Sequence, residues 1–224
     1  KKKEASDMFQ GKDKAVTFSY DDGVTQDRRL IELFGRYGLK ATFNLNSGLF
    51  SGGDRVPEQD IAALYAGHEI AVHTLTHPDL LKLDDEAVFH EVEDDRLRLS
   101  ELAGYEVIGM AYPYGTSDSR VVDILRRTGV RYSRTVACTH RFTLQKEGLL
   151  QLNPTVFHLE WEQLFALGEQ FVAMQPDTPQ LFYIWGHSIE LDRHDAWGKF
   201  ENFCRLIAGH DDIFYGTNRE VLGL

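Results

Sequence analysis

Acidic and imidazole side chains occur where short apolar runs of this sequence end. Asp21 and Asp22 follow residues 15–20, while His73 closes a later run and His77 comes four residues after it. One aspartate and two histidines are a common ligand set for a catalytic divalent ion, and they leave positions open for water and substrate. The other aspartate would stay free as a base, so the pattern indicates metal-assisted hydrolysis.

Each of these residues also has an ordinary structural interpretation. Adjacent acids at a turn often cap or solvate it, and two histidines four residues apart are often surface or hydrogen-bonded structural residues. Pro78 follows His77 directly and biases it away from helix. We therefore expect His73 at a strand end and His77 in the loop beyond it.

Other reactive groups follow later apolar runs. Residues 112–115 (Tyr-Pro-Tyr-Gly) follow one run, Arg134 lies near the end of the next, and residues 185–188 (Trp-Gly-His-Ser) follow a late one. In parallel β/α folds, the loops after the strands build the active site. These groups are therefore expected at one rim of the fold.

The elements that position these groups alternate between strand and helix. Strands are expected at residues 15–20, 41–45, 69–73, 107–112, 130–136, 181–185 and 213–215, with one or two more within 149–158. Helices are expected from Thr25 to Gly38, at 57–67, from Asp84 to Gly104, and at 117–127, 160–174 and 195–208. This alternation predicts an α/β fold with a parallel sheet and outer helices. About seven strands favour a single-domain, closed or nearly closed barrel, and an open doubly wound sheet is the alternative.

Composition excludes several classes of protein. The chain has 224 residues, 42% of them hydrophobic, and a formal net charge of −11. It is too apolar for a disordered chain, has no apolar run that could span a membrane, and is too acidic for non-specific binding to nucleic acid or anionic membranes. Cys138 and Cys204 are too far apart for a cysteine zinc site and are expected to be ordinary thiols, so any metal ligands must be histidines and carboxylates.

The first residues differ from the rest of the chain. Residues 1–13 are expected to form an N-terminal extension, and residues 14–224 the catalytic domain. The extension is charged and lacks the apolar core of a signal peptide, which favours a cytoplasmic location for the chain as given. Nothing in the sequence indicates an oligomeric state.

Four motifs together resemble the polysaccharide deacetylase family, which includes chitin and peptidoglycan deacetylases. They are residues 17–23 (Thr-Phe-Ser-Tyr-Asp-Asp-Gly), 73–77 (His-Thr-Leu-Thr-His), 111–115 (Ala-Tyr-Pro-Tyr-Gly) and 184–187 (Ile-Trp-Gly-His). Their order and spacing agree with the family over residues 14–220. The resemblance implies a distorted (β/α) barrel of about seven strands and a metal-dependent N- or O-deacetylase.

The resemblance also implies roles for the first two motifs. Asp22, His73 and His77 would bind the divalent metal, most often zinc, with cobalt or manganese as alternatives. Asp21, the first acid of the pair, would be the general base that takes a proton from the attacking water.

The later motifs would supply the remaining catalytic and binding groups. The backbone N–H of Tyr114 would stabilise the oxyanion, and His187 would protonate the leaving amine or alcohol, unless it is simply a core histidine at a strand end. Tyr112, Pro113 and Trp185 are expected to contact substrate, with Trp185 beside the acetyl group.

Two departures from the family pattern need explanation. The third motif usually begins with an arginine that pairs with the catalytic acid, and this chain has Ala111 there. We expect Arg134, at the end of the next strand, to supply the guanidinium instead; the alternative is a surface arginine. The family's usual acidic fourth motif, which orients the late histidine, is also not evident, and the candidates for orienting His187 are His158, Glu190 and Asp195.

The sequence therefore predicts a metal-dependent hydrolase that deacetylates carbohydrate, acting on carbon–nitrogen bonds other than peptide bonds. One alternative keeps the site and changes the substrate to a small non-sugar amide. Another is a catalytically weak protein that binds metal or carbohydrate. Asn44 and Asn46, after the second strand, are expected either to contact substrate or to form a turn.

Overall fold

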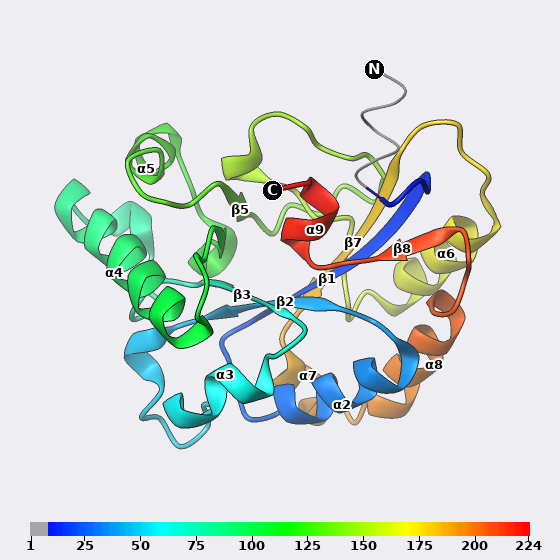
Figure 1. The fold of residues 1–224 in the computed structure, drawn as a ribbon, viewed down its shortest axis with the longest axis horizontal. Coiled ribbons are helices and arrows are strands. Elements are labelled where there is room, and N and C mark those ends of the chain that lie inside the picture. The colour runs from blue at the N-terminus through cyan, green and yellow to red at the C-terminus, as the bar shows by residue number, and fades with distance from the viewer. Residues whose placement is uncertain (1–8) are drawn as a thin grey trace.

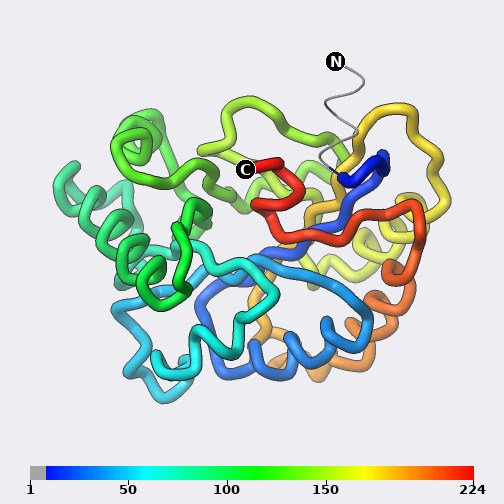
Figure 2. Tube along the Cα trace, viewed as in Figure 1, coloured from blue at the N-terminus to red at the C-terminus, as the bar shows by residue number. Residues whose placement is uncertain are grey.

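Strand β1 (Lys14–Asp21) lies at the centre of a curled parallel sheet in the computed structural model, which describes residues 9–224 (Figure 1). The sheet order is β5-β4-β3-β2-β1-β7-β6, and β8 also pairs with β1. Figure 2 shows β8, near the C-terminus, beside β1, near the N-terminus. β8 pairs with residues 14–16 of β1, and β2 pairs with residues 18–21. The other strands are β2 (Ala41–Leu45), β3 (Glu69–Val72), β4 (Gly109–Ala111), β5 (Tyr132–Arg134), β6 (Val156–Phe157), β7 (Gln180–Gly186) and β8 (Ile213–Tyr215).

One segment brings the two ends of this sheet together. Leu152 exchanges backbone hydrogen bonds with Ser133 and Thr135 beside β5, and four residues later the same segment enters β6, which pairs with β7. The sheet is therefore a distorted, nearly closed barrel. The alternative of an open doubly wound sheet is wrong, because its edges would remain apart.

Alternation along β1 separates two environments. Phe18 packs against Phe34 and Phe200 of the outer helices, whereas Ser19 and Asp21 point into the barrel and take part in hydrogen bonds there. Successive side chains of a strand face opposite sides, so the barrel has an apolar outer layer and a partly polar interior. That interior holds the site at its carboxyl end.

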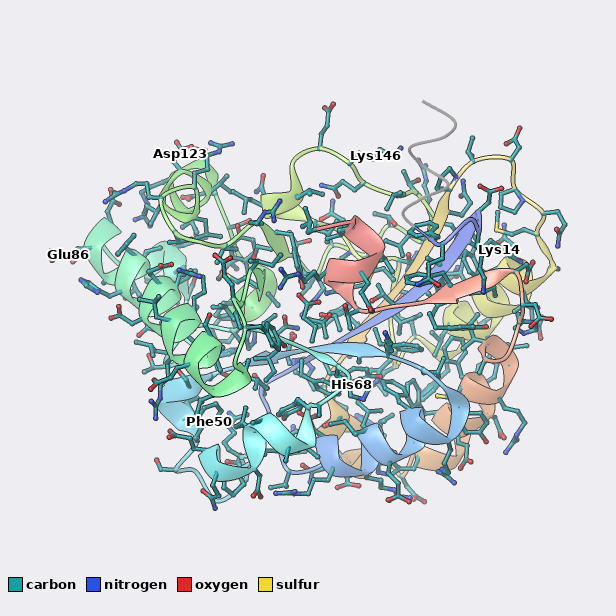
Figure 3. All side chains as sticks on the ribbon, viewed as in Figure 1. Lys14, Phe50, His68, Glu86, Asp123 and Lys146 are labelled. Carbon is teal, nitrogen blue, oxygen red and sulfur yellow. The ribbon has the colours of Figure 1, made fainter. Side chains whose placement is uncertain are left out.

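The helices cover the outside of the barrel. Charged side chains such as Glu86, Asp123 and Lys146 project from it into solvent (Figure 3). Within residues 9–224, none of the helices combines the length and the apolar character needed to cross a membrane. The helices are α2 (Asp27–Tyr37), α3 (Ile61–Leu64), α4 (Asp85–Ala103), α5 (Ser119–Leu125), α6 (Trp161–Ala173), α7 (Ser188–Arg193), α8 (Trp197–Ile207) and α9 (Asn218–Leu222).

Most helix boundaries follow the expected capping residues. Asp84 caps α4, and Gly104 ends it in the left-handed conformation. Two expected caps are wrong: α2 starts at Asp27, beyond Thr25, and the side chain of Asp118 caps α5 in place of Ser117. The expected helix at 57–67 is only a short turn followed by α3, because Glu58–Asp60 forms a 3-10 helix.

Two short helices, α7 and α9, are absent from the sequence expectations. Helix α7 begins directly after His187 and carries Glu190. Helix α9 lies at the opposite end of the barrel, where the backbone of Asn218 donates to Thr42. The expected extension falls partly outside the described residues, but Phe9 is buried and stacks on Phe214.

Candidate metal and catalytic site

The expected charged and imidazole groups of the site lie at or directly after the carboxyl end of a strand, except for His77, which follows in the loop beyond β3. Asp21 ends β1 and Asp22 follows it, His73 comes directly after β3, Arg134 ends β5, and His187 follows β7. Because all these strands are parallel, their carboxyl ends meet at one rim. The expectation of a shared rim is confirmed.

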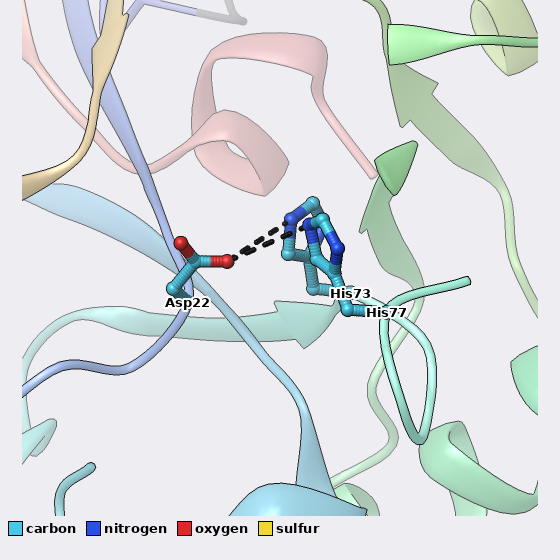
Figure 4. Close-up of side chains that lie close together, drawn as sticks. All are labelled: Asp22, His73 and His77. Atoms are coloured by element: carbon cyan, nitrogen blue, oxygen red, sulfur yellow. Dashed lines mark ion pairs between the residues drawn. The ribbon is translucent and has the colours of Figure 1, made fainter. Parts of the chain in front are cut away.

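Asp22, His73 and His77 converge on one point of this rim (Figure 4). The Nε2 atoms of His73 and His77 lie 3.5 and 3.7 Å from Asp22 Oδ1, and the three donor atoms lie within 4.8 Å of one another. His73 is 1% exposed, its Nδ1 donates to the Ala111 carbonyl at 2.7 Å, and its Nε2 has no hydrogen-bond partner within the described part of the chain. A buried imidazole nitrogen with a free lone pair, facing a carboxylate and a second imidazole, fits a divalent cation.

A layer of polar residues fixes the loop that carries these histidines. Asp95 of α4 accepts hydrogen bonds from the His73 backbone N–H at 3.2 Å and from Ser47 N–H at 2.8 Å. Asn46 Nδ2 donates to the carbonyls of His73 and Thr74 at 2.5 and 2.9 Å. Asn46 therefore positions a candidate ligand and does not face substrate. Such contacts orient imidazole ligands and tune metal affinity.

The backbone is strained at the same point. Asp22, Thr74, His77 and Tyr114 all adopt positive φ angles, of 83°, 69°, 60° and 58°. Left-handed conformations of non-glycine residues are energetically costly and cluster at functional sites, where surrounding structure holds them in place.

Asp21 lies beside this group and is held by Arg134. Arg134 Nη2 contacts both carboxylate oxygens of Asp21 at 2.5 Å, and Nε donates to Ser19 at 3.1 Å. Both residues are almost fully buried, and the guanidinium lies over the Trp185 ring, 4.6 Å from its centroid. Burial alone would raise the pKa of Asp21, but the charge of Arg134 opposite holds it below its usual value.

The strand that carries Arg134 lies beside the strand that carries Ala111 of the third motif. Ala111 and Arg134 are directly paired on neighbouring strands β4 and β5. The small Ala111 side chain leaves the barrel interior open to the guanidinium of its neighbour. Asn44 Nδ2 also donates to Asp21 at 2.9 Å, so the buried Asn44 helps to hold the candidate base.

His187 lies across from Asp21, with its Nε2 3.9 Å from Asp21 Oδ2. Its Nδ1 is 3.2 Å from Glu190 Oε2, an ion-pair distance that does not meet the angular requirement of a hydrogen bond. Burial by itself lowers the pKa of His187, but the carboxylates of Glu190 and Asp21 raise it to about 9. Of the three candidates for orienting His187, Glu190 contacts it, His158 contacts Glu190, and Asp195 is an exposed loop residue with no contact to His187 in the described structure.

The expected substrate-binding residues lie in different environments. Tyr112 is 1% exposed and donates its hydroxyl to the Leu150 carbonyl at 2.6 Å, and Pro113 is also buried. Both side chains are packed in the core, and the expectation that they contact substrate stays a prediction. Tyr114 is 64% exposed and packs edge-on against His77, while Trp185 is half-buried beside His187.

Three functional neighbours escaped the sequence analysis. Asp95 and Asp27 are buried carboxylates on α4 and α2, and burial raises the pKa of each to about 7. Arg55 donates to the Asp22 carbonyl at 2.8 Å and lines a cavity of about 210 Å³ together with Asp22 and His187. In the sequence, the burial of the two acids is indicated by their place on the largely apolar face of an amphipathic helix.

The chain is similar to several known proteins. Chitin deacetylase 1 of Cryptococcus neoformans is 31% identical over 130 residues, covering 56% of this chain and 26% of its own length. The peptidoglycan-N-acetylglucosamine deacetylase PgdA of Listeria monocytogenes is 25% identical over 113 residues, covering 49% and 23%. The matched region thus spans about a quarter of these curated relatives.

A solved structure shares the fold over nearly the whole chain. The family 4 carbohydrate esterase of Streptomyces lividans, in complex with acetate, matches with a TM-score of 0.63 and 18% identity, over 92% of this chain and 93% of that one. This likeness concerns the fold alone. The family model for polysaccharide deacetylase matches residues 10–133, which include β1 to β4 and both candidate metal-binding motifs. The chain therefore belongs to the polysaccharide deacetylase family.

Proposed function

We propose that this protein is a metal-dependent hydrolase that removes acetyl groups from N- or O-acetylated carbohydrate. The observation that carries the proposal is a buried carboxylate, Asp21, which is held by Arg134 beside the donor group of Asp22, His73 and His77. A carboxylate that is not needed as a ligand, next to a set of ligands, is what a hydrolytic site requires to activate water. Family membership and the named activities of the relatives support acetylated sugars as the substrate class.

Asp22, His73 and His77 are the residues that would hold the divalent ion. Zinc is the first candidate for two imidazoles and a carboxylate, with cobalt or manganese as alternatives. When bound, the ion would polarise the acetyl carbonyl and make water more acidic.

Asp21 and His187 would move the protons. Asp21, kept ionised by Arg134, takes a proton from water as the water oxygen attacks the acetyl carbon. The C–N or C–O bond then breaks, and His187 gives its proton to the departing nitrogen or oxygen. The products are acetate and a free amine or hydroxyl, and proton exchange with solvent restores both residues. With a pKa raised to about 9, His187 carries that proton at neutral pH.

The rim also offers a donor for the charge that develops on the carbonyl oxygen. We assign this role to the backbone N–H of Tyr114, whose strained conformation places it at the exposed edge of the site. Losing one such donor typically costs ~3–4 kcal/mol of transition-state stabilisation. The exposed Tyr114 ring and the half-buried Trp185 are the aromatic surfaces available to a sugar.

Acetate release and metal content test the proposal together. Purified protein is supplied with zinc or cobalt and assayed on acetylated chito-oligosaccharides, acetyl esters and small amides. We expect acetate from at least one acetylated sugar, loss of activity with a chelator, and less bound metal in His77→Ala. His90→Ala is the matched control, because His90 is an exposed histidine of α4 that pairs only with Asp94 among the described residues.

Two results would overturn the proposal. Equal metal content in His77→Ala and wild type would remove the ligand assignment. Sugar binding without acetate release would instead make the chain a metal- or carbohydrate-binding protein, and turnover of small amides alone would move it to the non-sugar amidases.

A further inference from the structure

A single carboxylate oxygen joins two histidines beside the site. Glu190 Oε2 accepts a hydrogen bond from His158 Nε2 at 2.8 Å and one from the His187 backbone N–H at 3.1 Å, and it lies 3.2 Å from His187 Nδ1. His158 comes from the end of β6, 32 residues before Glu190. The contact therefore ties the short helix α7 to the barrel wall at the height of His187.

His158 is fixed on every side. It is fully buried, its Nδ1 is 3.1 Å from the Tyr20 hydroxyl, and its ring packs edge-on against Tyr20 and Phe200. Gly186 of β7 leaves the space that the ring fills, because a Cβ atom there would overlap it. The space and the hydrogen-bond partners at this position therefore fit an imidazole ring.

The hydrogen bonds define the state of this imidazole. Glu190 accepts, so His158 Nε2 must carry the proton, and Nδ1 must then accept from the Tyr20 hydroxyl. Burial also lowers the pKa of His158, which agrees with a neutral ring. Tyr20, His158, Glu190 and His187 thus form one chain of hydrogen-bonded and ion-paired groups that runs from the apolar layer to the rim.

We propose that His158 is a positioning residue that acts through Glu190 on His187, an inference that rests on the proposed function. Glu190 stands on a helix of six residues, and its side chain is 20% exposed. His158 holds the Glu190 carboxylate against solvent, so that one oxygen remains beside His187 Nδ1 and the Nε2 proton points to the leaving group.

A simple packing role would not require these groups. Phenylalanine would fill the same space without the cost of burying two ring nitrogens, and a leucine in place of Glu190 would need no partner. Both positions carry polar groups, and Glu190 joins His158 to His187, an imidazole that faces Asp21.

Leaving-group dependence separates positioning from packing. An amide nitrogen needs a proton to depart, whereas the 4-nitrophenolate of 4-nitrophenyl acetate departs without one. We expect His158→Phe to lower kcat on an acetylated chito-oligosaccharide by roughly tenfold or more, with KM little changed, because general acid catalysis contributes ~10²–10⁴-fold. Turnover of 4-nitrophenyl acetate should stay within about twofold, the same selectivity that His187→Ala is expected to show.

Companion variants keep the test decisive. His158→Gln retains an N–H donor for Glu190 and should restore part of the amide activity, while Tyr20→Phe removes only the far end of the chain and should give a smaller selective loss. His68→Gln is the matched control, because His68 also packs on an aromatic ring and accepts a backbone hydrogen bond, away from the site. Metal content and melting temperature are measured for every variant.

Several outcomes would refute the inference. If the His158→Phe variant retains metal and loses activity equally on both substrates, His158 is only a packing residue. The same conclusion follows if the variant loses activity on neither substrate. Imidazole ¹H–¹⁵N spectra of the wild-type protein provide a test that does not depend on turnover, and a proton on His158 Nδ1 in place of Nε2 would contradict the arrangement. Failure of the proposed function has a different signature, namely wild-type protein that releases acetate from neither substrate.

Discussion

Replacing Arg134 by alanine removes the cation that Asp21 faces inside the barrel. The wild-type guanidinium contacts both Asp21 oxygens, and the side chains of Arg134 and Asp21 are 0% and 4% exposed. Removing one partner of a buried ion pair typically costs ~3–5 kcal/mol, because the remaining charge is left uncompensated. Asp21 in the variant avoids most of this cost by taking up a proton, and a protonated carboxyl cannot accept one from water.

Asp27 provides an internal reference for the size of this effect. It is fully buried, its partners are the Ser188 and Tyr65 hydroxyls, and burial raises its pKa to about 7. Asp21 without Arg134 keeps similar neutral partners, Asn44 among them, so its pKa should move toward that of Asp27. A base whose pKa has risen is ionised in fewer molecules at pH 6 than at pH 8.5, because each pKa unit is a factor of ten in the ratio of the two forms.

The assay is the pH dependence of kcat for acetate release between pH 5 and 9. Wild type should keep its activity toward the acid side, since the pKa of Asp21 lies below its usual value, whereas Arg134→Ala should lose activity as the pH falls through neutrality. We expect a loss of roughly 10²-fold at pH 6, which includes misorientation of the base, with a smaller loss at pH 8.5. Arg131→Ala, at an exposed arginine three residues earlier, is the matched control.

A second variant tests whether the position of the guanidinium is what matters. Ala111 pairs directly with Arg134, so Ala111→Arg combined with Arg134→Ala returns the cation to the place that the third family motif usually gives it. We expect this double variant to recover part of the lost activity at low pH. Coincident pH profiles for wild type and Arg134→Ala, with equal metal content, would refute the reasoning.

Three further substitutions probe the surroundings of the site. Asp95→Asn places an amide N–H against the His73 backbone N–H and should weaken metal affinity by ~10–100-fold, measured by competition with a chromophoric chelator; unchanged affinity would contradict the role of Asp95. Asp27 has a folded-state pKa of about 7, above its unfolded value, so its ionisation destabilises the fold increasingly from about pH 4 to pH 7. Asp27→Asn should therefore stabilise the protein more at pH 8 than at pH 5, by at most about 3 kcal/mol in chemical denaturation, because only the two pKa units between pH 5 and the folded pKa separate the two conditions. An equal effect at both pH values would count against this. Gly186→Ala should displace the His158 ring and lower turnover of the amide more than turnover of the ester. Wild-type kinetics on both substrates would show that the space left by Gly186 is not needed.

The rim of the site could be predicted because it depends on a rule of topology. Residues that follow parallel strands meet at one end of the barrel, whatever the exact strand lengths. β4 and β5 are each three residues long, shorter than expected, yet Arg134 still lies at the strand end. Small errors in element boundaries therefore leave the site prediction intact.

The supporting groups could not be predicted, because their burial is decided by packing between distant segments. Asp95 lies in a helix with many exposed acids, and its place on the apolar face of that helix does not reveal its contacts with Ser47 and the His73 backbone. Glu190 could be named as a candidate but not selected, because its helix α7 was not expected and its partner His158 comes from the two-residue strand β6.

The polar interior of the barrel explains both why the rim of the site could be predicted and why its supporting groups could not. In β1, Ser19 and Asp21 alternate with Phe18 and Tyr20, a period of two that a fully apolar core strand would not need. A buried polar side chain must find partners, and inward positions on other strands supply them. Asn44 from the neighbouring β2 and Arg134 from β5, which is not paired with β1, both bind Ser19 as well as Asp21. The pattern of β1 therefore predicts that complementary polar residues exist, but their identity depends on which strands close the barrel. This is why an arginine from β5 can replace one from β4 without changing the charge that the base meets.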